Sequence, residues 1–203
     1  MIALLIAASV SMTVSLLGTK YLIPWLQAAG VGQPIRLDGP EGHLVKAGTP
    51  TMGGVAIVLG AVAGYVVSHL RAETVITRSG ITLTMAIIGA GLVGFLDDLI
   101  KVSRERNLGL NKKAKIIGLL SVGISFALLA MYWGDVDSII TFTRADFPNL
   151  VVPRAVWVIW AVVLILATSN AVNLTDGLDG LATVPIILVA GCFALISYVT
   201  GHI

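Results

Sequence analysis

The sequence has little charge and almost no cysteine. Asp, Glu, Lys and Arg make up 12% of its 203 residues, whereas a soluble domain carries roughly 25%. With 57% hydrophobic residues, this composition excludes a soluble globule, a disordered segment and a nucleic-acid-binding domain. The single cysteine, Cys192, excludes an intramolecular disulfide and a multi-cysteine metal site. Because Cys192 lies in an apolar run, we interpret it as an inert, packed thiol.

Long uncharged runs are what the sequence has instead. Each run is long enough to cross a bilayer as a helix, which takes about 20 apolar residues. The six runs are Met1–Thr19, Thr51–Ser68, Ser79–Leu96, Ile116–Gly134, Ala155–Thr175 and Gly180–Gly201. We therefore expect an all-α, polytopic transmembrane helical bundle of about six spans, forming one domain over residues 1–203 among membrane lipids.

Basic residues between the spans predict the orientation in the membrane. Nine of them fall on the side of the connections 28–50, 97–115 and 170–180, and four on the other side. Positive residues favour the cytoplasm, so these connections are expected to be cytoplasmic and both chain ends outside (N-out, C-out). The outer loop is rich in β-branched and aromatic residues, which predicts a small β-hairpin near 138–150.

The third span ends with two adjacent carboxylates, Asp97 and Asp98, followed by Lys101. An aspartate costs about 2.5–3.5 kcal/mol at the centre of a membrane helix, so the pair is expected at a wet cytoplasmic mouth. Lys101 is within helical reach of both carboxylates. Acids at the carboxyl end of a helix oppose its dipole, which favours a bound cation. The alternative is a charged helix end in the headgroup region.

A second polar cluster follows the fifth span. Asn170, Asn173, Asp176 and Asp179 are each three residues apart, a spacing that one continuous α-helix cannot aim at a single ligand. A 3₁₀ turn or a helix that ends near Gly177 could do so. Amides and carboxylates suit the hydrogen bonds of a base and a ribose. The alternative is a capped interhelical turn.

A third segment, which begins at Lys46, leads into the second span. Thr49 as N-cap with Pro50 at the first helical position predicts a helix start there. A helix amino terminus with glycines and a nearby lysine can hold a phosphate. The alternative is a cap with no ligand.

Together the three segments resemble the polyprenyl-phosphate N-acetylhexosamine-1-phosphate transferase superfamily, and within it the bacterial phospho-N-acetylmuramoyl-pentapeptide transferases. The matching stretches read KAGTPTMGG, GFLDDLIK with GLNKKAK, and SNAVNLTDGLDGLA. They occur in the family's order over the whole chain. The resemblance implies a Mg²⁺-dependent enzyme of the bacterial plasma membrane with its active face in the cytoplasm. It would transfer the phospho-sugar of UDP-N-acetylmuramoyl-pentapeptide to undecaprenyl phosphate, giving lipid I and UMP in peptidoglycan synthesis.

The resemblance also implies residue roles. Asp97 and Asp98 would be catalytic and, with Asp176, would bind the metal. The expected substrate-binding residues are Lys46, Lys101, Lys113, Asn170, Asn173, Asp176 and Asp179. Asp97 could act as a base toward the lipid phosphate, but a phosphate monoester has its second pKa near 6. A role in positioning the acceptor or the metal therefore stays equally open.

The family has about ten spans, so the chain resembles its amino-terminal portion and is expected to be inactive alone; a homodimer is also compatible with the resemblance. Three alternatives remain open: a sister transferase that uses another UDP-N-acetylhexosamine, an ion-coupled transporter and a non-catalytic membrane fragment. A transporter would carry its acids near the bilayer midplane, whereas these are expected at the ends of spans.

Overall fold

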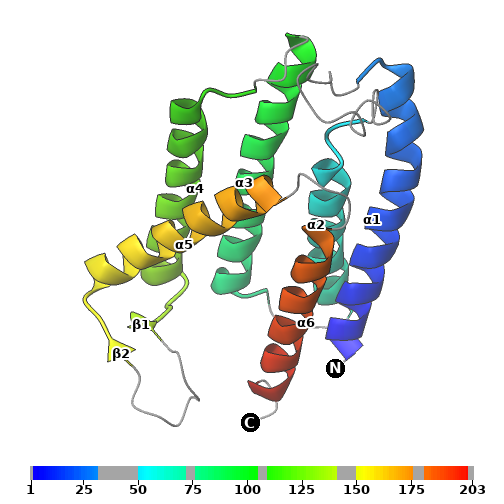
Figure 1. Cartoon of the computed structure of the whole chain (residues 1–203). Coiled ribbons are helices and arrows are strands. Elements are labelled where there is room, and N and C mark those ends of the chain that lie inside the picture. Colours follow the sequence, from blue (N-terminus) through cyan, green and yellow to red (C-terminus); the bar gives the residue numbers. More distant parts are fainter. Residues whose placement is uncertain are drawn as a thin grey trace.

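The computed structural model describes residues 2–31, 50–71, 76–104, 109–140, 150–175 and 181–200. Within these ranges the chain forms six α-helices and one two-stranded sheet (Figure 1). The helices are α1 Ile2–Ala28, α2 Gly54–Arg71, α3 Arg78–Ser103, α4 Lys112–Tyr132, α5 Arg154–Thr175 and α6 Thr183–Thr200. The expected all-α architecture is confirmed, with one helix at each predicted span.

Four of these helices, α1, α3, α4 and α5, are long and apolar enough to cross a membrane. The apolar parts of α2 and α6 are shorter, Gly54–Leu70 and Thr183–Val199. Large apolar side chains such as Leu16, Leu92 and Ile159 are exposed on the helix surfaces. In water such a surface would drive aggregation, whereas lipid chains solvate it. The chain is therefore a membrane protein.

Small residues bring α1 and α2 together, and this is the most extensive helix contact among the described residues. A Cβ atom at Gly60 would lie 2.8 Å from the backbone oxygen of Ser11, and one at Gly64 would lie 2.6 Å from that of Ala7. The two glycines are four residues apart and thus share one face of α2. Since lipid gives no hydrophobic drive for helix pairing, such close backbone approach is a main source of packing energy.

From α2 to α5, each helix packs on the next one in the chain, and at each contact a valine lies against a glycine. Val58 of α2 meets Gly91 of α3, and Val93 of α3 meets Gly118 of α4. On α4, Gly123 contacts Val162 of α5, and α5 crosses α4 obliquely (Figure 1). This succession joins α1 to α5 and fixes the rotation of each helix about its axis.

We predict that Gly64→Ala destabilises the fold by about 1–3 kcal/mol, a typical cost of overpacking. The added methyl would collide with the backbone of α1 and the hydroxyl of Ser11. Gly191→Ala in α6 is the matched control, because a Cβ there meets nothing within 4 Å and alanine favours helix. Thermal unfolding in detergent micelles checks the pair. Equal midpoints for the two variants would mean that the α1–α2 contact is not tightly packed.

The second helix begins later than expected. The Thr49–Pro50 helix start is wrong, because α2 begins at Gly54. Met52 has a φ of 75°, a left-handed conformation that cannot continue a helix. Thr49 itself lies outside the described residues. By contrast, α3 and α4 have side-chain caps: Thr77 accepts from the N–H of Gly80, and Asn111 accepts from that of Ala114.

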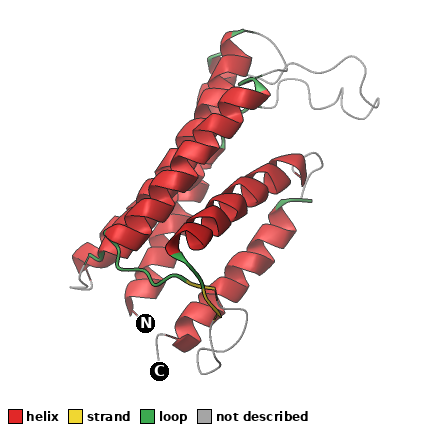
Figure 2. Ribbon diagram, turned by 90° about the vertical axis from the view of Figure 1, so that its left-hand side faces the viewer, coloured by secondary structure: helices red, strands yellow, loops and turns green. Residues whose placement is uncertain are grey.

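The predicted hairpin is present. Strand β1 (Ile139–Ile140) pairs antiparallel with β2 (Leu150–Val151), with Ile139 opposite Val151. Figure 2, turned by 90° from Figure 1, places this hairpin toward the same end of the molecule as the start of α1 and the end of α6. The carboxyl end of α3 lies at the other end (Figure 1).

The last helix, α6, stands apart from the packed succession. Its side chains from Thr183 to Val199 are all exposed. Cys192 is therefore exposed as well, and the interpretation of a packed thiol is wrong. An apolar sequence run predicts burial, but α6 turns its apolar sides outward.

Candidate active site

Asp97, near the carboxyl end of α3, is only 6% exposed. Its Oδ1 accepts from the N–H of Leu110 at 2.9 Å, and its Oδ2 lies 2.7 Å from Nζ of Lys101. Leu110 can approach because Gly109 has no side chain: a Cβ there would lie 2.6 Å from Oδ1. A buried carboxylate is stable only when it is paired and hydrogen-bonded, and both conditions are met here.

Asp98 reaches in a different direction, toward the start of α2. Its Oδ2 accepts from the N–H of Met52 at 3.2 Å, and its Oδ1 lies 2.9 Å from Nζ of Lys101. The left-handed backbone of Met52 costs roughly 1–2 kcal/mol for a residue other than glycine. The charge-assisted hydrogen bond to Asp98 offsets part of this cost. It also links the residues just before α2 to the end of α3.

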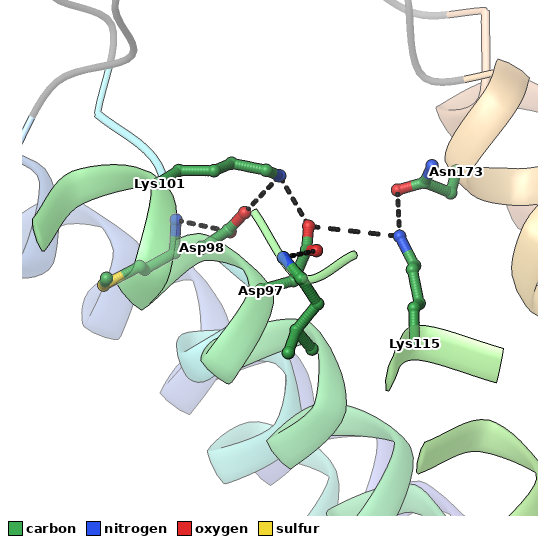
Figure 3. Close-up of polar contacts among 7 residues, drawn as sticks. Asp97, Asp98, Lys101, Lys115 and Asn173 are labelled. Carbon is green, nitrogen blue, oxygen red and sulfur yellow. Dashed lines mark hydrogen bonds and ion pairs between the residues drawn. The ribbon is translucent and has the colours of Figure 1, made fainter. Parts of the chain in front are cut away.

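Two lysines complete the group (Figure 3). Lys101 bridges the two carboxylates, and Lys115 of α4 lies 3.9 Å from Oδ2 of Asp97. Lys115 also donates to Oδ1 of Asn173 on α5 at 3.3 Å, so the contacts run from α3 through α4 to α5. We name Asp97, Asp98, Lys101, Lys115 and Asn173 the carboxylate–lysine cluster. Two carboxylates and two ammonium groups give it a formal charge of zero.

The structure brings together four of the residues selected from sequence: Asp97, Asp98, Lys101 and Asn173. Asn170 instead donates to the backbone oxygen of Leu166, one turn earlier in its own helix. Lys113 is exposed on the first turn of α4. Lys46, Asp176 and Asp179 lie outside the described residues, so their roles stay predictions.

Lys115 and the backbone amides of Met52 and Leu110 were missed by sequence reasoning. For Lys115 a signal was available in the helix period. It lies three residues before Gly118 and seven before Val122, and both of these residues face α3. Positions at these spacings share one helix face, whereas Lys113 is rotated away. The two backbone amides carry no side-chain signal.

A cavity of about 220 Å³ adjoins the cluster. Its lining includes Met52, Gly94 and Phe95 together with Asp97, Asp98, Lys115 and Asn173. A Cβ at Gly94 would meet nothing within 4 Å, so the absent side chain leaves this wall open. The cavity is thus lined by paired charges on one side and by apolar residues such as Phe95 on the other.

The carboxylates of Asp97 and Asp98 supply some, but not all, of the ligands that a divalent cation needs. Among the described residues, no three His, Cys, Asp or Glu side chains gather closely enough to hold a metal ion. Mg²⁺, however, usually binds through one or two carboxylates together with substrate phosphates and water. Asp97 and Asp98 beside the cavity fit a Mg²⁺ ion of this shared kind.

Comparison with known proteins places most of the chain in one group. Residues 80–203 match the family model described as glycosyl transferase family 4. Residues 46–58 match signature 1 of the phospho-N-acetylmuramoyl-pentapeptide-transferases. The first match contains the whole carboxylate–lysine cluster, and the second contains Met52.

Individual relatives agree. The phospho-N-acetylmuramoyl-pentapeptide-transferase of Cutibacterium acnes is 44% identical over 200 residues, which is 96% of this chain and 56% of the relative. The enzymes of the same name from Frankia casuarinae and Thermobifida fusca are each 45% identical, over 96% and 98% of this chain and 56% of each relative. The chain thus spans about half the length of the curated relatives it matches.

Proposed function

The chain belongs to glycosyl transferase family 4, and we propose that it forms the carboxylate–lysine part of the reaction centre of a phospho-N-acetylmuramoyl-pentapeptide transferase. The reaction transfers phospho-N-acetylmuramoyl-pentapeptide from its UDP donor to undecaprenyl phosphate. It yields lipid I and UMP, the first membrane step of peptidoglycan synthesis. The observation that carries the proposal is the convergence of Asp97, Asp98, Lys115 and Asn173 on one cavity, with Lys101 bridging the two carboxylates.

The chemistry is a displacement at phosphorus. An oxygen of the undecaprenyl phosphate forms a bond to the sugar-linked phosphorus of the donor, and the bond from that phosphorus to the oxygen of UMP breaks. Negative charge then spreads over the bridging and leaving oxygens. Preorganised cations are the main means of stabilising such charge, and Lys101 and Lys115 supply two of them.

The two carboxylates would hold these cations in place. Lys101 is fixed between Asp97 and Asp98, and Asn173 orients Lys115. At neutral pH a phosphate monoester is mostly dianionic, because its second pKa is near 6. The acceptor thus needs no base. Asp97 is buried and already bonded to Lys101 and to the N–H of Leu110, which suits a positioning role better than a proton-accepting one.

Mg²⁺ fits this scheme for a reason of charge. The cluster is formally neutral, so it cannot by itself offset the charge of a pyrophosphate and a lipid phosphate. Asp97 and Asp98 would hold the Mg²⁺ ion. When bound, it would supply that positive charge and polarise the phosphoryl oxygens. Asp176 is a further proposed ligand. Lys46, Lys113, Asn170 and Asp179 are proposed to contact the donor.

Activity is tested in a chimaera in which residues 1–203 replace the matching part of the Thermobifida fusca relative. We expect UMP release with undecaprenyl phosphate, Mg²⁺ and UDP-N-acetylmuramoyl-pentapeptide. With UDP-N-acetylglucosamine the rate should fall at least about 100-fold, because a donor that lacks groups recognised by a polar site leaves those partners unpaired. A preference for the second donor would assign the chain to a sister transferase. A chimaera that folds but releases no UMP with either donor would refute the proposal.

We further propose that the cluster faces the cytoplasm of the bacterial cell, as the basic residues indicate. The exposed Lys112 and Asp137 lie near opposite ends of α4 and suit single-cysteine labelling after Cys192→Ala. A maleimide that cannot cross membranes should label Asp137→Cys in intact cells and Lys112→Cys only after permeabilisation. The reverse pattern would place the cluster outside and exclude a cytoplasmic donor.

A further inference from the structure

An apolar groove of about 250 Å³ is lined by α2 and α3, and we name it the α2–α3 groove. Its described lining consists of apolar side chains and two glycines. Three of these side chains, Leu59, Ile88 and Leu92, are 58%, 37% and 55% exposed. The groove is therefore open to the lipid chains around the bundle. Such a lining suits a hydrocarbon chain and offers a polar molecule no side-chain hydrogen bond.

The α2–α3 groove adjoins the cavity beside the carboxylate–lysine cluster. The residues that line both are Gly54, Val55, Val58, Gly91 and Phe95. Along α3 the lining continues from Ile88 in the groove to Asp98 in the cavity, a distance of about 15 Å at the rise of an α-helix. The groove thus leads from the apolar part of the span to the charged end of the bundle, where α2 begins and α3 ends (Figure 1).

Only a thin wall separates the groove from the cavity. A Cβ at Gly91 would lie 2.8 Å from Cγ2 of Val58, so the two helices touch there because residue 91 is glycine. One turn nearer to the cluster, Gly94 lines the cavity, and a Cβ there would meet nothing within 4 Å. Phe95 is half-buried and lines both spaces. Past the contact of Val58 with Gly91 there is thus free space, and Phe95 lies at the boundary.

The two substrates of the proposed reaction differ in what they need from such a groove. The UDP donor is soluble in water, and its phosphates, sugar and peptide are polar. The acceptor carries its phosphate at the end of a long isoprenoid chain. This phosphate must reach the lysines of the cluster, whereas the chain is stable only in apolar surroundings. A groove that joins the lipid to the charged cavity meets both requirements.

We propose that the α2–α3 groove binds the isoprenoid chain of the acceptor and delivers its phosphate to the carboxylate–lysine cluster. The chain enters sideways from the bilayer past Leu59 and Leu92. Its first isoprene units lie against Val58 and Phe95, and its phosphate lies in the cavity beside Lys115. This assignment rests on the proposed function. With the proposed orientation, the groove takes the acceptor from the inner leaflet.

Photolabelling of the 203-residue chain in nanodiscs tests the site without any turnover. The probe is geranylgeranyl phosphate that carries a diazirine in its second isoprene unit, and mass spectrometry identifies the labelled residues. We expect the label on α2 between Val55 and Leu59 and on α3 between Ile88 and Phe95. Excess undecaprenyl phosphate should prevent the labelling. Phosphatidic acid, which carries the same phosphate monoester on acyl chains, should compete at least about tenfold less well.

Leu92→Trp and Leu83→Trp form a matched pair of variants. Both leucines lie on α3 and are 55% exposed, but Leu83 lines a different cavity, next to α1. In the chimaera, Leu92→Trp should raise the KM for undecaprenyl phosphate about tenfold, because the indole displaces roughly two buried methylene groups of the chain. The KM for the UDP donor should stay the same, which shows that the variant is folded. Leu83→Trp should change neither KM.

The proposal is overturned if the label spreads evenly over the exposed faces of the helices, or if phosphatidic acid competes as well as undecaprenyl phosphate. Either result would mean that any lipid chain fills the groove. An active chimaera in which Leu92→Trp leaves the KM for the acceptor unchanged would also overturn it. The proposed function fails separately: a chimaera without UMP release, in a chain whose groove is labelled and protected by undecaprenyl phosphate, would support the groove and refute the transferase.

Discussion

Replacing Asp98 or Asp97 by asparagine in the chimaera is expected to lower kcat for UMP release at least about 100-fold each. Asparagine keeps the shape of the side chain but removes the negative charge that holds Lys101. A 100-fold loss corresponds to about 2.7 kcal/mol of transition-state stabilisation. That amount is typical of one lost electrostatic or acid–base group.

The two variants should fail for partly different reasons. Asp98→Asn weakens the hydrogen bond from the N–H of Met52 to residue 98, so the residues just before α2 are held less firmly against α3. Asp97→Asn places an amide between Lys101 and the N–H of Leu110, where one of its two polar atoms meets a like donor. Asp137→Asn is the control and should keep full activity, because Asp137 is exposed and follows the end of α4 opposite to Lys115.

The pH profile separates a base from a positioning role for Asp97. A positioning carboxylate leaves the acid limb of kcat/KM near the second pKa of the lipid phosphate, about 6, in both the wild type and Asp97→Asn. A base would remove or shift that limb in the variant. If either asparagine variant turns over at a near-normal rate, the residue in question is only a charge at the end of a membrane helix.

At saturating donor, Lys115→Gln is expected to lower kcat at least about 100-fold. Lys113→Gln removes a proposed donor contact, so it should raise the KM for the donor and change kcat by less than about threefold. The two lysines lie two residues apart on the first turn of α4, so either substitution removes one positive charge from the same end of the helix. Only Lys115 reaches Asp97 and Asn173, and Lys113 is exposed. A point charge in the partly buried cluster acts more strongly than one in solvent.

Measurements at saturating donor and at two ionic strengths complete this comparison. Salt screens an exposed charge but affects a half-buried one much less, so the defect of Lys115→Gln should persist at high salt. If Lys113→Gln proves the more damaging variant, α4 is rotated differently in the active protein and Lys113 is the residue that meets phosphate.

The sequence alone predicted the helices because membrane spans are set by simple counting of apolar residues. It also predicted the contact of Lys101 with both carboxylates, since residues three and four apart in a helix are neighbours. The hairpin near 138–150 was likewise predictable from its β-branched composition.

Contacts between distant segments could not be predicted in this way. The bond from Met52 to Asp98 joins residues 46 positions apart, and it depends on a left-handed backbone that methionine does not signal. The choice of Lys115 over Lys113 depends on the rotation of α4, which valine–glycine contacts determine. The exposure of Cys192 depends on α6 standing apart from the helices before it. In each case the decisive fact is a relation between elements rather than a property of one.

The succession of neighbour contacts also has a consequence for biogenesis. Each helix from α2 to α5 contacts the helix synthesised just before it. Pairing can therefore begin while the ribosome is still working, because no helix must wait for a distant segment, and chains commonly fold from the N-terminus during synthesis. The cluster is assembled in the same order: Met52 emerges first, the two aspartates next, then Lys115, and Asn173 closes it last. A ribosome stalled after α4 would expose Lys115 without its amide partner, so arrest at successive lengths should reveal when the charged end of the bundle becomes ordered.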